Sequence, residues 1–181
     1  DGPWNASAHV SKICKSGFSI TPDIRKRGRK PPPMRYKRPE ERAYIDQMIA
    51  DGILERGDTQ FCVPHFFIYK PGKLRLVFNG KKLNDAVKPP PKFNMKSHAA
   101  LQRLAARKAF HAADDLKNHF FSTKIAEPSR KYFGINTPQG TFRYTSLPFG
   151  FNWSPFIAHV CVDQVCKRAI EAGFSVTFTT S

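Results

Sequence analysis

Two short segments rich in aromatic and β-branched residues, 61–69 and 74–78, are separated by only four residues. These four run from Lys70 to Lys73 and include a Pro-Gly pair, which is typical of a tight turn. Two strands that are joined in this way pair as an antiparallel hairpin. We therefore expect a hairpin with a basic tip, and any fold assigned to the chain must accommodate it.

The rest of the chain alternates between strand-like and helix-like segments. Further strands are predicted at residues 110–116, 131–135, 141–147 and 174–178. Helices, in which apolar residues recur about every 3.6 positions, are predicted to begin at Pro39, Ser97 and Pro155. We therefore expect an α+β fold in which helices pack on one side of a mostly antiparallel sheet.

The charge of the chain indicates the kind of partner that it binds. Lys and Arg number 30 against 14 Asp and Glu, which gives a net charge of +16. Such an excess favours a polyanionic partner, above all nucleic acid. The 16 Phe residues exclude a wholly disordered basic tail. A length of 181 residues is consistent with one domain, or with one lobe of a larger domain.

Residues 1–38 show no clear hydrophobic period and are expected to form a basic, proline-containing arm or linker. A cluster of cations in this arm precedes a triplet of prolines at 31–33. The cations expected to contact nucleic acid are Arg25, Lys26, Arg27, Arg29 and Lys30. The alternatives are that the cluster acts as a nuclear address or is a solvated run of charge.

Several features favour a cytoplasmic or nuclear location without a membrane partner. The sequence has no run of 18 apolar residues, and residues 1–5 lack the profile of a signal peptide. The four cysteines lack the spacing of a zinc site and are expected to be reduced thiols. The missing initiator Met and a chain end close to a predicted strand suggest an excerpt of a longer product.

Four segments carry a resemblance to a known family. They are residues 72–77, 82–84, 115–122 and 147–155. In order and spacing they resemble the reverse transcriptases of retroelements. The resemblance implies the fingers and palm of a right-hand polymerase without its thumb, with residues 39–96 fingers-like and residues 97–181 a partial palm. It also implies an RNA-directed DNA polymerase, which uses deoxynucleoside triphosphates to extend the 3′-hydroxyl of a primer on an RNA or DNA template.

The resemblance assigns a metal-binding and catalytic role to Asp115, which matches the first catalytic aspartate of the family. Phosphoryl transfer of this kind uses divalent ions, Mg²⁺ or Mn²⁺, which carboxylates hold in place. Asp114 is the competing candidate, but neighbouring side chains on a strand point to opposite faces, so only one of the two faces the ions. The spacing to residues 120–122 favours Asp115.

The same resemblance implies that the hairpin residues Lys70 and Arg75 bind the triphosphate of the incoming nucleotide. Arg75 would supply a forked set of hydrogen-bond donors, and Lys70 a single positive charge. The alternative is that both residues are simply exposed charges on a hairpin.

Phe120 matches the aromatic gate of the family, a flat ring that would collide with a ribose 2′-hydroxyl and so favour deoxynucleotides. The alternative role of Phe120 is core packing. Phe149 and Gly150 belong to a Pro-Phe-Gly sequence before a predicted helix, where backbone can approach a nucleotide closely. Gly150 is otherwise a simple turn glycine. Trp153 either stacks on a base or is buried, and the sequence leaves both open.

The end of the sequence departs from the family pattern. In the family, a strand after this helix carries an aromatic residue, then any residue, then two aspartates that complete the metal site. Here Phe178 matches the aromatic residue, while Thr180 and Ser181 stand where the aspartates belong. Hydroxyl groups carry no charge with which to bind Mg²⁺ tightly. We therefore expect this chain to be part of a reverse transcriptase that is inactive without the two aspartates. The alternative is a non-catalytic, nucleic-acid-binding relic of a polymerase.

Overall fold

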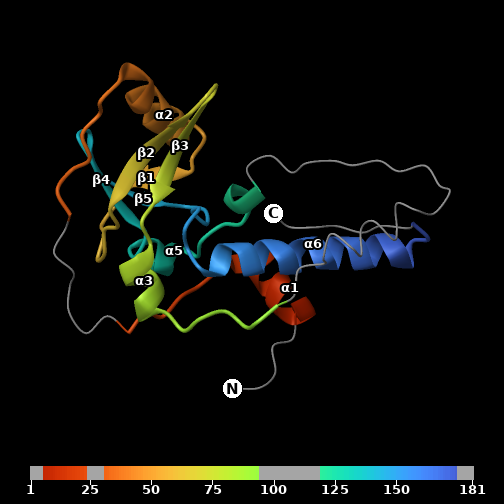
Figure 1. Cartoon of the computed structure of the whole chain (residues 1–181). Helices are drawn as coiled ribbons and strands as arrows, with labels where there is room; N and C mark the ends of the chain where they lie inside the picture. Colours follow the sequence, from red (N-terminus) through yellow and green to blue (C-terminus); the bar gives the residue numbers. More distant parts are fainter. Residues whose placement is uncertain (1–5, 24–30, 94–118, 175–181) are drawn as a thin grey trace.

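A computed structural model of the chain describes residues 6–23, 31–93 and 119–174 (Figure 1). Its helices are α1 (Ala6–Ser16), α2 (Pro39–Ala50), α3 (Lys81–Ala86), the 3-10 helix η1 (His119–Ser122), α5 (Glu127–Arg130) and α6 (Trp153–Glu171). Its strands are β1 (Leu54–Arg56), β2 (His65–Lys70), β3 (Lys73–Phe78), β4 (Gly134–Thr137) and β5 (Gly140–Tyr144). The α+β class is confirmed. The helix predicted from Ser97 and the strand predicted at 110–116 lie outside the described residues.

The predicted hairpin is confirmed as the antiparallel pair β2–β3, which forms a sheet of its own (Figure 1). Lys70 lies opposite Lys73, so Pro71 and Gly72 make the turn. Gly72 has a φ of 68°, in the left-handed region that glycine adopts without strain. The turn chemistry in the sequence therefore located the hairpin correctly.

The second sheet has the strand order β1-β5-β4 and is antiparallel throughout. Strands β4 and β5 form another hairpin, in which Thr137 lies opposite Gly140. β4 begins at Gly134 rather than at residue 131, because the turn after α5 includes Phe133, whose backbone N–H donates to the carbonyl oxygen of Arg130. The single sheet that we expected is thus two separate antiparallel sheets within the described residues.

Helix α2 begins at Pro39, as predicted, and Gly52 follows its end with a φ of 67°. Glu41 is buried in the first turn and accepts hydrogen bonds from the backbone N–H of Lys37 and the hydroxyl of Tyr69. Burial opposes the charged form of Glu41, but these hydrogen bonds outweigh burial and lower the pKa of the carboxyl group. The buried carboxylate therefore ties α2 to strand β2.

Phenylalanine side chains dominate the core. Phe133, Phe142 and Phe151 are almost fully buried. The ring centroid of Phe133 lies 5.0 Å from that of Phe151 and 6.3 Å from that of Phe78, at the end of β3. One aromatic cluster thereby joins both sheets to the segment before α6.

No helix in the described ranges is both long enough and apolar enough to cross a membrane.

Residues 1–38 were expected to form an arm or linker, and within this range the structure describes folded chain at residues 6–23. Residues 6–16 form helix α1, which lies against α6 (Figure 1). Three side chains of this region belong to the core, namely Ile13, Phe18 and Ile20. Part of the predicted arm is therefore an integral layer of the fold.

Helix α1 was missed because its stability does not come from its own sequence. It has only 11 residues, and an isolated helix of that length is marginal in water. Packing against α6 provides the stability that a helix of this length lacks on its own.

The cations expected to contact nucleic acid, Arg25, Lys26, Arg27, Arg29 and Lys30, lie outside the described residues, so their role stays a prediction.

His65 links the two sheets and is expected to make stability depend on pH. Its Nδ1–H donates to the carbonyl oxygen of Val63 at 2.6 Å, so its Nε2 accepts from the Tyr144 hydroxyl at 3.2 Å. Burial lowers the pKa of His65 from 6.5 to about 4, and the hydrogen bond to Val63 opposes part of that shift. The neutral ring is therefore favoured in the folded state.

The sign of the pH effect follows from this lowered pKa. The contribution of His65 to the free energy of unfolding is complete above pH 6.5 and is lost as the pH falls toward 4, by up to about 3 kcal/mol. Denaturant titrations from pH 4 to 7 should show this loss in the natural chain and a flatter profile in His65→Gln. An equally steep profile in His65→Gln, with His9→Gln as the control, would contradict the assignment.

Candidate nucleotide and nucleic-acid site

Lys70 and Arg75 share the outward face of the β2–β3 hairpin. Side chains alternate along a strand, and the pairing of Ile68 with Arg75 and of Lys70 with Lys73 places these residues on one face. All of them are exposed, and Phe66 on the same face is 48% exposed. Among the described residues, neither Lys70 nor Arg75 forms an ion pair. The hairpin thus presents positive charge beside apolar surface.

Three phenylalanine rings meet where η1 approaches the loop before α6. The ring centroid of Phe149 lies 4.7 Å from that of Phe120 and 5.5 Å from that of Phe121, both in edge-to-face contact. Phe149 remains 47% exposed, and Phe120 is only partly buried. The structure therefore brings the predicted gate residue and the predicted loop residue together, with surface of both rings accessible.

Gly150 occupies a position that tolerates no side chain. Its φ is 101°, in the region that other residues rarely adopt. A Cβ atom on Gly150 would overlap the carbonyl oxygen of Phe78, and a Cβ atom on Gly80 would lie 2.7 Å from the carbonyl oxygen of Gly150. This backbone-to-backbone contact sets the loop against the end of β3.

Asn84 fastens the same loop from helix α3. Its Nδ2 donates to the carbonyl oxygen of Gly150 and its Oδ1 accepts from the backbone N–H of Asn152, each at 3.0 Å. Both ends of one amide are used, which fixes the loop on either side of Phe151. Asn84 lies in one of the segments that resemble the family, but no role was predicted for it. Its partners lie 66 and 68 residues away, so no local pattern could have revealed them.

Side chains at the start of α6 complete the attachment of the loop. The hydroxyl of Ser154 donates to the carbonyl oxygen of Pro148 at 2.8 Å. The Nε1–H of Trp153 donates to the carbonyl oxygen of Lys88 at 2.7 Å, and its ring lies 5.4 Å from that of Phe18. Trp153 is half-buried, so it packs against the fold and still presents surface.

The predicted metal site falls outside the described residues. Asp115, Phe178, Thr180 and Ser181 all lie in ranges that the structure does not describe. Within the ranges it does describe, no three His, Cys, Asp or Glu side chains are grouped so that they could hold a metal ion. The roles of these four residues stay predictions, and we assign no chemical step to a metal ion.

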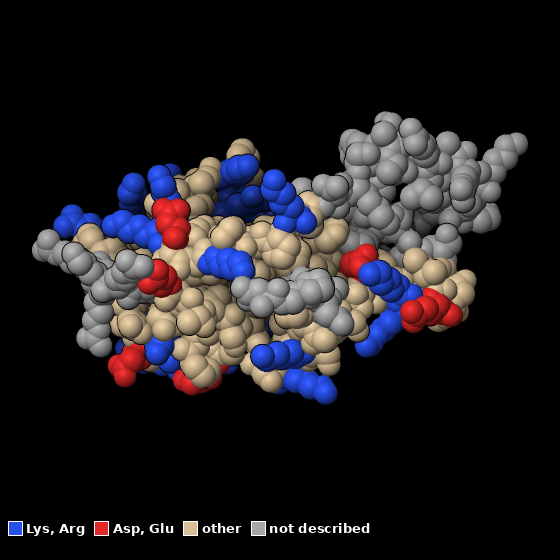
Figure 2. All heavy atoms as spheres, turned by 90° about the horizontal axis from the view of Figure 1, so that it is seen from below, with Lys and Arg blue, Asp and Glu red and all other residues tan. Residues whose placement is uncertain are grey.

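Positive charge is distributed widely over the surface. On the face shown in Figure 2, Lys and Arg side chains are spread out rather than gathered into one patch. Some cations have structural partners, since Arg130 and Arg143 both pair with Glu55, at 3.0 and 2.7 Å. The excess charge favours association with a polyanion at long range.

Residues 68–179 match the protein family described as reverse transcriptase (RNA-dependent DNA polymerase). This chain belongs to the reverse transcriptase family. Over 152 residues, the chain is 32% identical to a polyprotein of Cassava vein mosaic virus, a match that covers 75% of the chain and 22% of the polyprotein. Over 132 residues it is 24% identical to the Transposon Tf2-3 polyprotein of Schizosaccharomyces pombe, covering 71% of the chain and 10% of that polyprotein. The chain thus spans only a small part of these relatives.

Solved structures of foamy virus proteins share the fold of this chain. The protease–reverse transcriptase of prototype foamy virus matches 86% of the chain with a TM-score of 0.63 and 23% identity, over 20% of its own length. The foamy viral protease–reverse transcriptase in complex with an RNA/DNA hybrid matches 91% of the chain with a TM-score of 0.61 and 22% identity, over 23% of its own length. At this identity the similarity supports the fold alone.

Proposed function

We propose that this chain is the fingers-and-palm part of an RNA-directed DNA polymerase, which adds deoxynucleotides to a primer 3′-hydroxyl on an RNA or DNA template. The observation that carries the proposal is the position of the Phe149 and Gly150 loop, which contacts Phe120 and the end of β3. Two segments that are far apart in sequence, and are expected to bind the same nucleotide, therefore meet. Residues 39–96 and 97–181 remain our proposed division into fingers and palm.

In this role Lys70 and Arg75 bind the triphosphate of the incoming nucleotide. Phosphoryl transfer spreads negative charge over the phosphoryl oxygens, and fixed cations stabilise that charge. Arg75 offers several donors in a rigid fork, whereas Lys70 offers one compact charge. Support comes from their common exposed face and from the lack of any ion pair to either residue among the described residues.

Phe120 acts as the gate that selects deoxynucleotides, and Phe149 and Gly150 lie beside the nucleotide. Edge contact with Phe149 restrains the ring of Phe120 while leaving part of it accessible. The tight contact between Gly150 and Phe78 holds the loop backbone in one place. A fixed ring can reject a ribose by collision, since a 2′-hydroxyl would need the space that the ring fills.

Asp115 is the proposed ligand of the catalytic Mg²⁺ or Mn²⁺ ions, which would neutralise the triphosphate when bound. Thr180 and Ser181 occupy the positions proposed for the paired aspartates. With one of three expected carboxylates, the chain as given is proposed to bind template and primer without extending the primer. The hydroxyl residues Thr180 and Ser181, which stand where two aspartates are expected, favour the alternative function, a non-catalytic relic that binds nucleic acid.

The proposed polyanionic partner is a template–primer duplex of RNA and DNA. Support comes from the net charge of +16 and from the fold shared with foamy viral reverse transcriptases that were solved with an RNA/DNA hybrid and with double-stranded DNA. The cations Arg25, Lys26, Arg27, Arg29 and Lys30 are proposed to add phosphate contacts.

Discrimination between deoxy- and ribonucleotides tests the proposed nucleotide site. We would measure the affinities for dUTP and UTP, which differ only in the 2′-hydroxyl, in the presence of a template–primer with a templating adenine. The natural chain should prefer dUTP by about tenfold or more, and Phe120→Ala should abolish the preference. Phe121→Ala removes the neighbouring ring and should retain it. No preference in the natural chain, or equal losses in the two variants, would contradict the proposed gate.

A further inference from the structure

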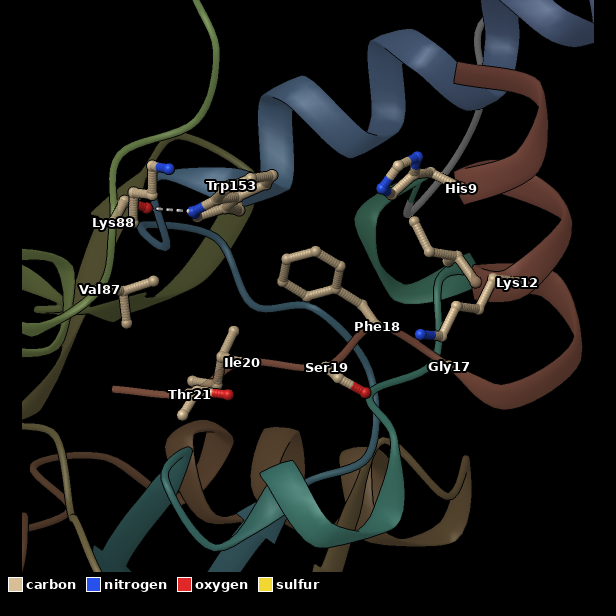
Figure 3. A pocket seen from close by; sticks show the side chains of 11 residues that line it. His9, Lys12, Gly17, Phe18, Ser19, Ile20, Thr21, Val87, Lys88 and Trp153 are labelled. Atoms are coloured by element: carbon tan, nitrogen blue, oxygen red, sulfur yellow. Dashed lines mark hydrogen bonds between the residues drawn. The ribbon is translucent and has the colours of Figure 1, made fainter. Parts of the chain in front are cut away.

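A cavity of about 320 Å³ lies between α1, the segment after α1, the segment after α3 and the start of α6 (Figure 3). Its apolar lining comes from Ile13, Phe18, Ile20, Val87 and Trp153. None of these residues is proposed to contact the incoming nucleotide, although Trp153 also helps to attach the loop that carries Phe149 and Gly150. Because α1 and the residues after it form one wall, the cavity exists only because this part of the chain is folded.

One wall of the cavity is aromatic. The ring centroids of Phe18 and Trp153 lie 5.4 Å apart with an angle of 41° between the rings. The hydrogen bond from Trp153 to the carbonyl oxygen of Lys88 fixes the orientation of the indole ring (Figure 3). In Figure 3 the ring of Phe18 lies between Trp153 and Ile20. Fixed aromatic rings of this kind suit the flat, apolar faces of nucleobases.

The polar lining of the cavity is basic. Among the residues that the structure describes, His9, Lys12 and Lys88 line it, and no Asp or Glu does. Lys12 is exposed and forms no ion pair among the described residues, and α1 contains no acidic residue that could neutralise it. In Figure 3 its ammonium group points toward Phe18. The charge therefore favours a ligand that carries an anionic group beside its aromatic part.

The size of the cavity limits the ligand. Its volume is at the lower end of the range of about 300–1,000 Å³ that is typical of small-ligand sites. A paired duplex is too wide to enter, whereas a single unpaired nucleotide unit is of suitable dimensions. In the sequence, the lining residue Thr21 comes four positions before Arg25, where the predicted phosphate-contacting cations begin.

We propose that this cavity binds one unpaired nucleotide of a single-stranded nucleic acid. The base lies against Phe18 and Trp153, and the phosphate lies near Lys12. The inference rests on the proposed function, because it names the place where a single-stranded part of the template is held. The cavity would be a second region of contact with nucleic acid, and the start of α6 connects it to the nucleotide site around Phe149.

Trp153 provides a direct optical signal for this site. The chain has two tryptophans, so a Trp4→Phe chain retains Trp153 as its sole tryptophan. Titration with a single-stranded oligothymidylate should quench this fluorescence to saturation, because a stacked base contacts the indole ring. Lys12→Glu should raise the Kd by about tenfold, since it replaces a phosphate-binding cation with an anion. Lys15→Glu makes the same charge change on the same helix, outside the cavity, and should raise the Kd by less than about threefold.

A parallel titration with a blunt RNA/DNA hybrid separates this inference from the proposed function. Duplex binding without oligothymidylate quenching, or with equal effects of Lys12→Glu and Lys15→Glu, would overturn the cavity as a nucleotide site and leave the proposed function standing. Quenching that is sensitive to Lys12 but not to Lys15, without duplex binding, would support the cavity and contradict template–primer binding. If the natural chain binds neither the oligothymidylate nor the duplex, both the cavity proposal and the proposed function would be overturned.

Discussion

Gly150→Ala is expected to destabilise the chain by about 4 kcal/mol and to abolish nucleotide discrimination. The added Cβ atom would overlap the carbonyl oxygen of Phe78, and the φ of 101° is strained for alanine. Because the obstacle is the backbone at the buried end of β3 rather than a flexible side chain, the loop has to move. Phe149 would then lose its contact with Phe120, and with it the restraint on the proposed gate.

Gly52→Ala is the matched control for this prediction. Gly52 also has a positive φ, of 67°, but nothing lies within 4 Å of the position of its Cβ atom. Its substitution therefore reports the backbone strain alone, about 1 kcal/mol. Urea titrations of both variants separate strain from overlap. Equal losses of stability in the two variants would mean that the close approach of Gly150 to β3 does not constrain the loop.

Gly17→Ala is expected to detach helix α1 from the rest of the fold, at a cost of about 3 kcal/mol. Gly17 ends α1 with a φ of 79°, and its Cβ atom would lie 2.6 Å from the backbone nitrogen of Ala126. Two backbone hydrogen bonds lie beside this contact, from Phe18 to Lys124 at 2.8 Å and from Ala126 to Phe18 at 2.9 Å. The substitution cannot be accommodated without separating these segments.

Hydrogen exchange distinguishes detachment of α1 from general unfolding. In Gly17→Ala, amides of residues 6–23 should lose protection while those of β4 and β5 retain it. The cavity beside Trp153 should be lost as well, because α1 forms one of its walls. Protection of residues 6–23 at the level of the natural chain would contradict the role assigned to α1 as a folded layer.

The parts of the fold that the sequence predicted are those governed by local chemistry. The Pro71-Gly72 turn indicated the β2–β3 hairpin, and Pro39 with its following acids indicated the start of α2. Helix α1 was missed because its stability depends on α6, which is more than a hundred residues away in sequence. Division of the strands into two sheets was missed for the same reason, since strand patterns do not specify partners across long separations.

In the candidate site, too, some features were predicted from the sequence, while those that depend on distant contacts were not. Resemblance to the family pointed to Phe120 and Phe149, and the structure places their rings in contact. The sequence placed Lys70 and Arg75 on the predicted hairpin, and the observed register adds that both lie on one face. The two-ended hydrogen bonding of Asn84 was not predictable, because it depends on a loop that is distant in sequence.

Primer extension, combined with a salt titration of template binding, tests the central claim most directly. The assay uses an RNA template, a DNA primer, Mg²⁺ and deoxynucleotides, with the natural chain and Asp115→Asn. We predict no extension by either chain, and an affinity for template–primer that falls about a thousandfold between roughly 50 and 200 mM salt. Extension by the natural chain that is lost in Asp115→Asn would contradict the account, because other carboxylates would then complete the metal site. Binding that is absent or insensitive to salt would contradict it as well.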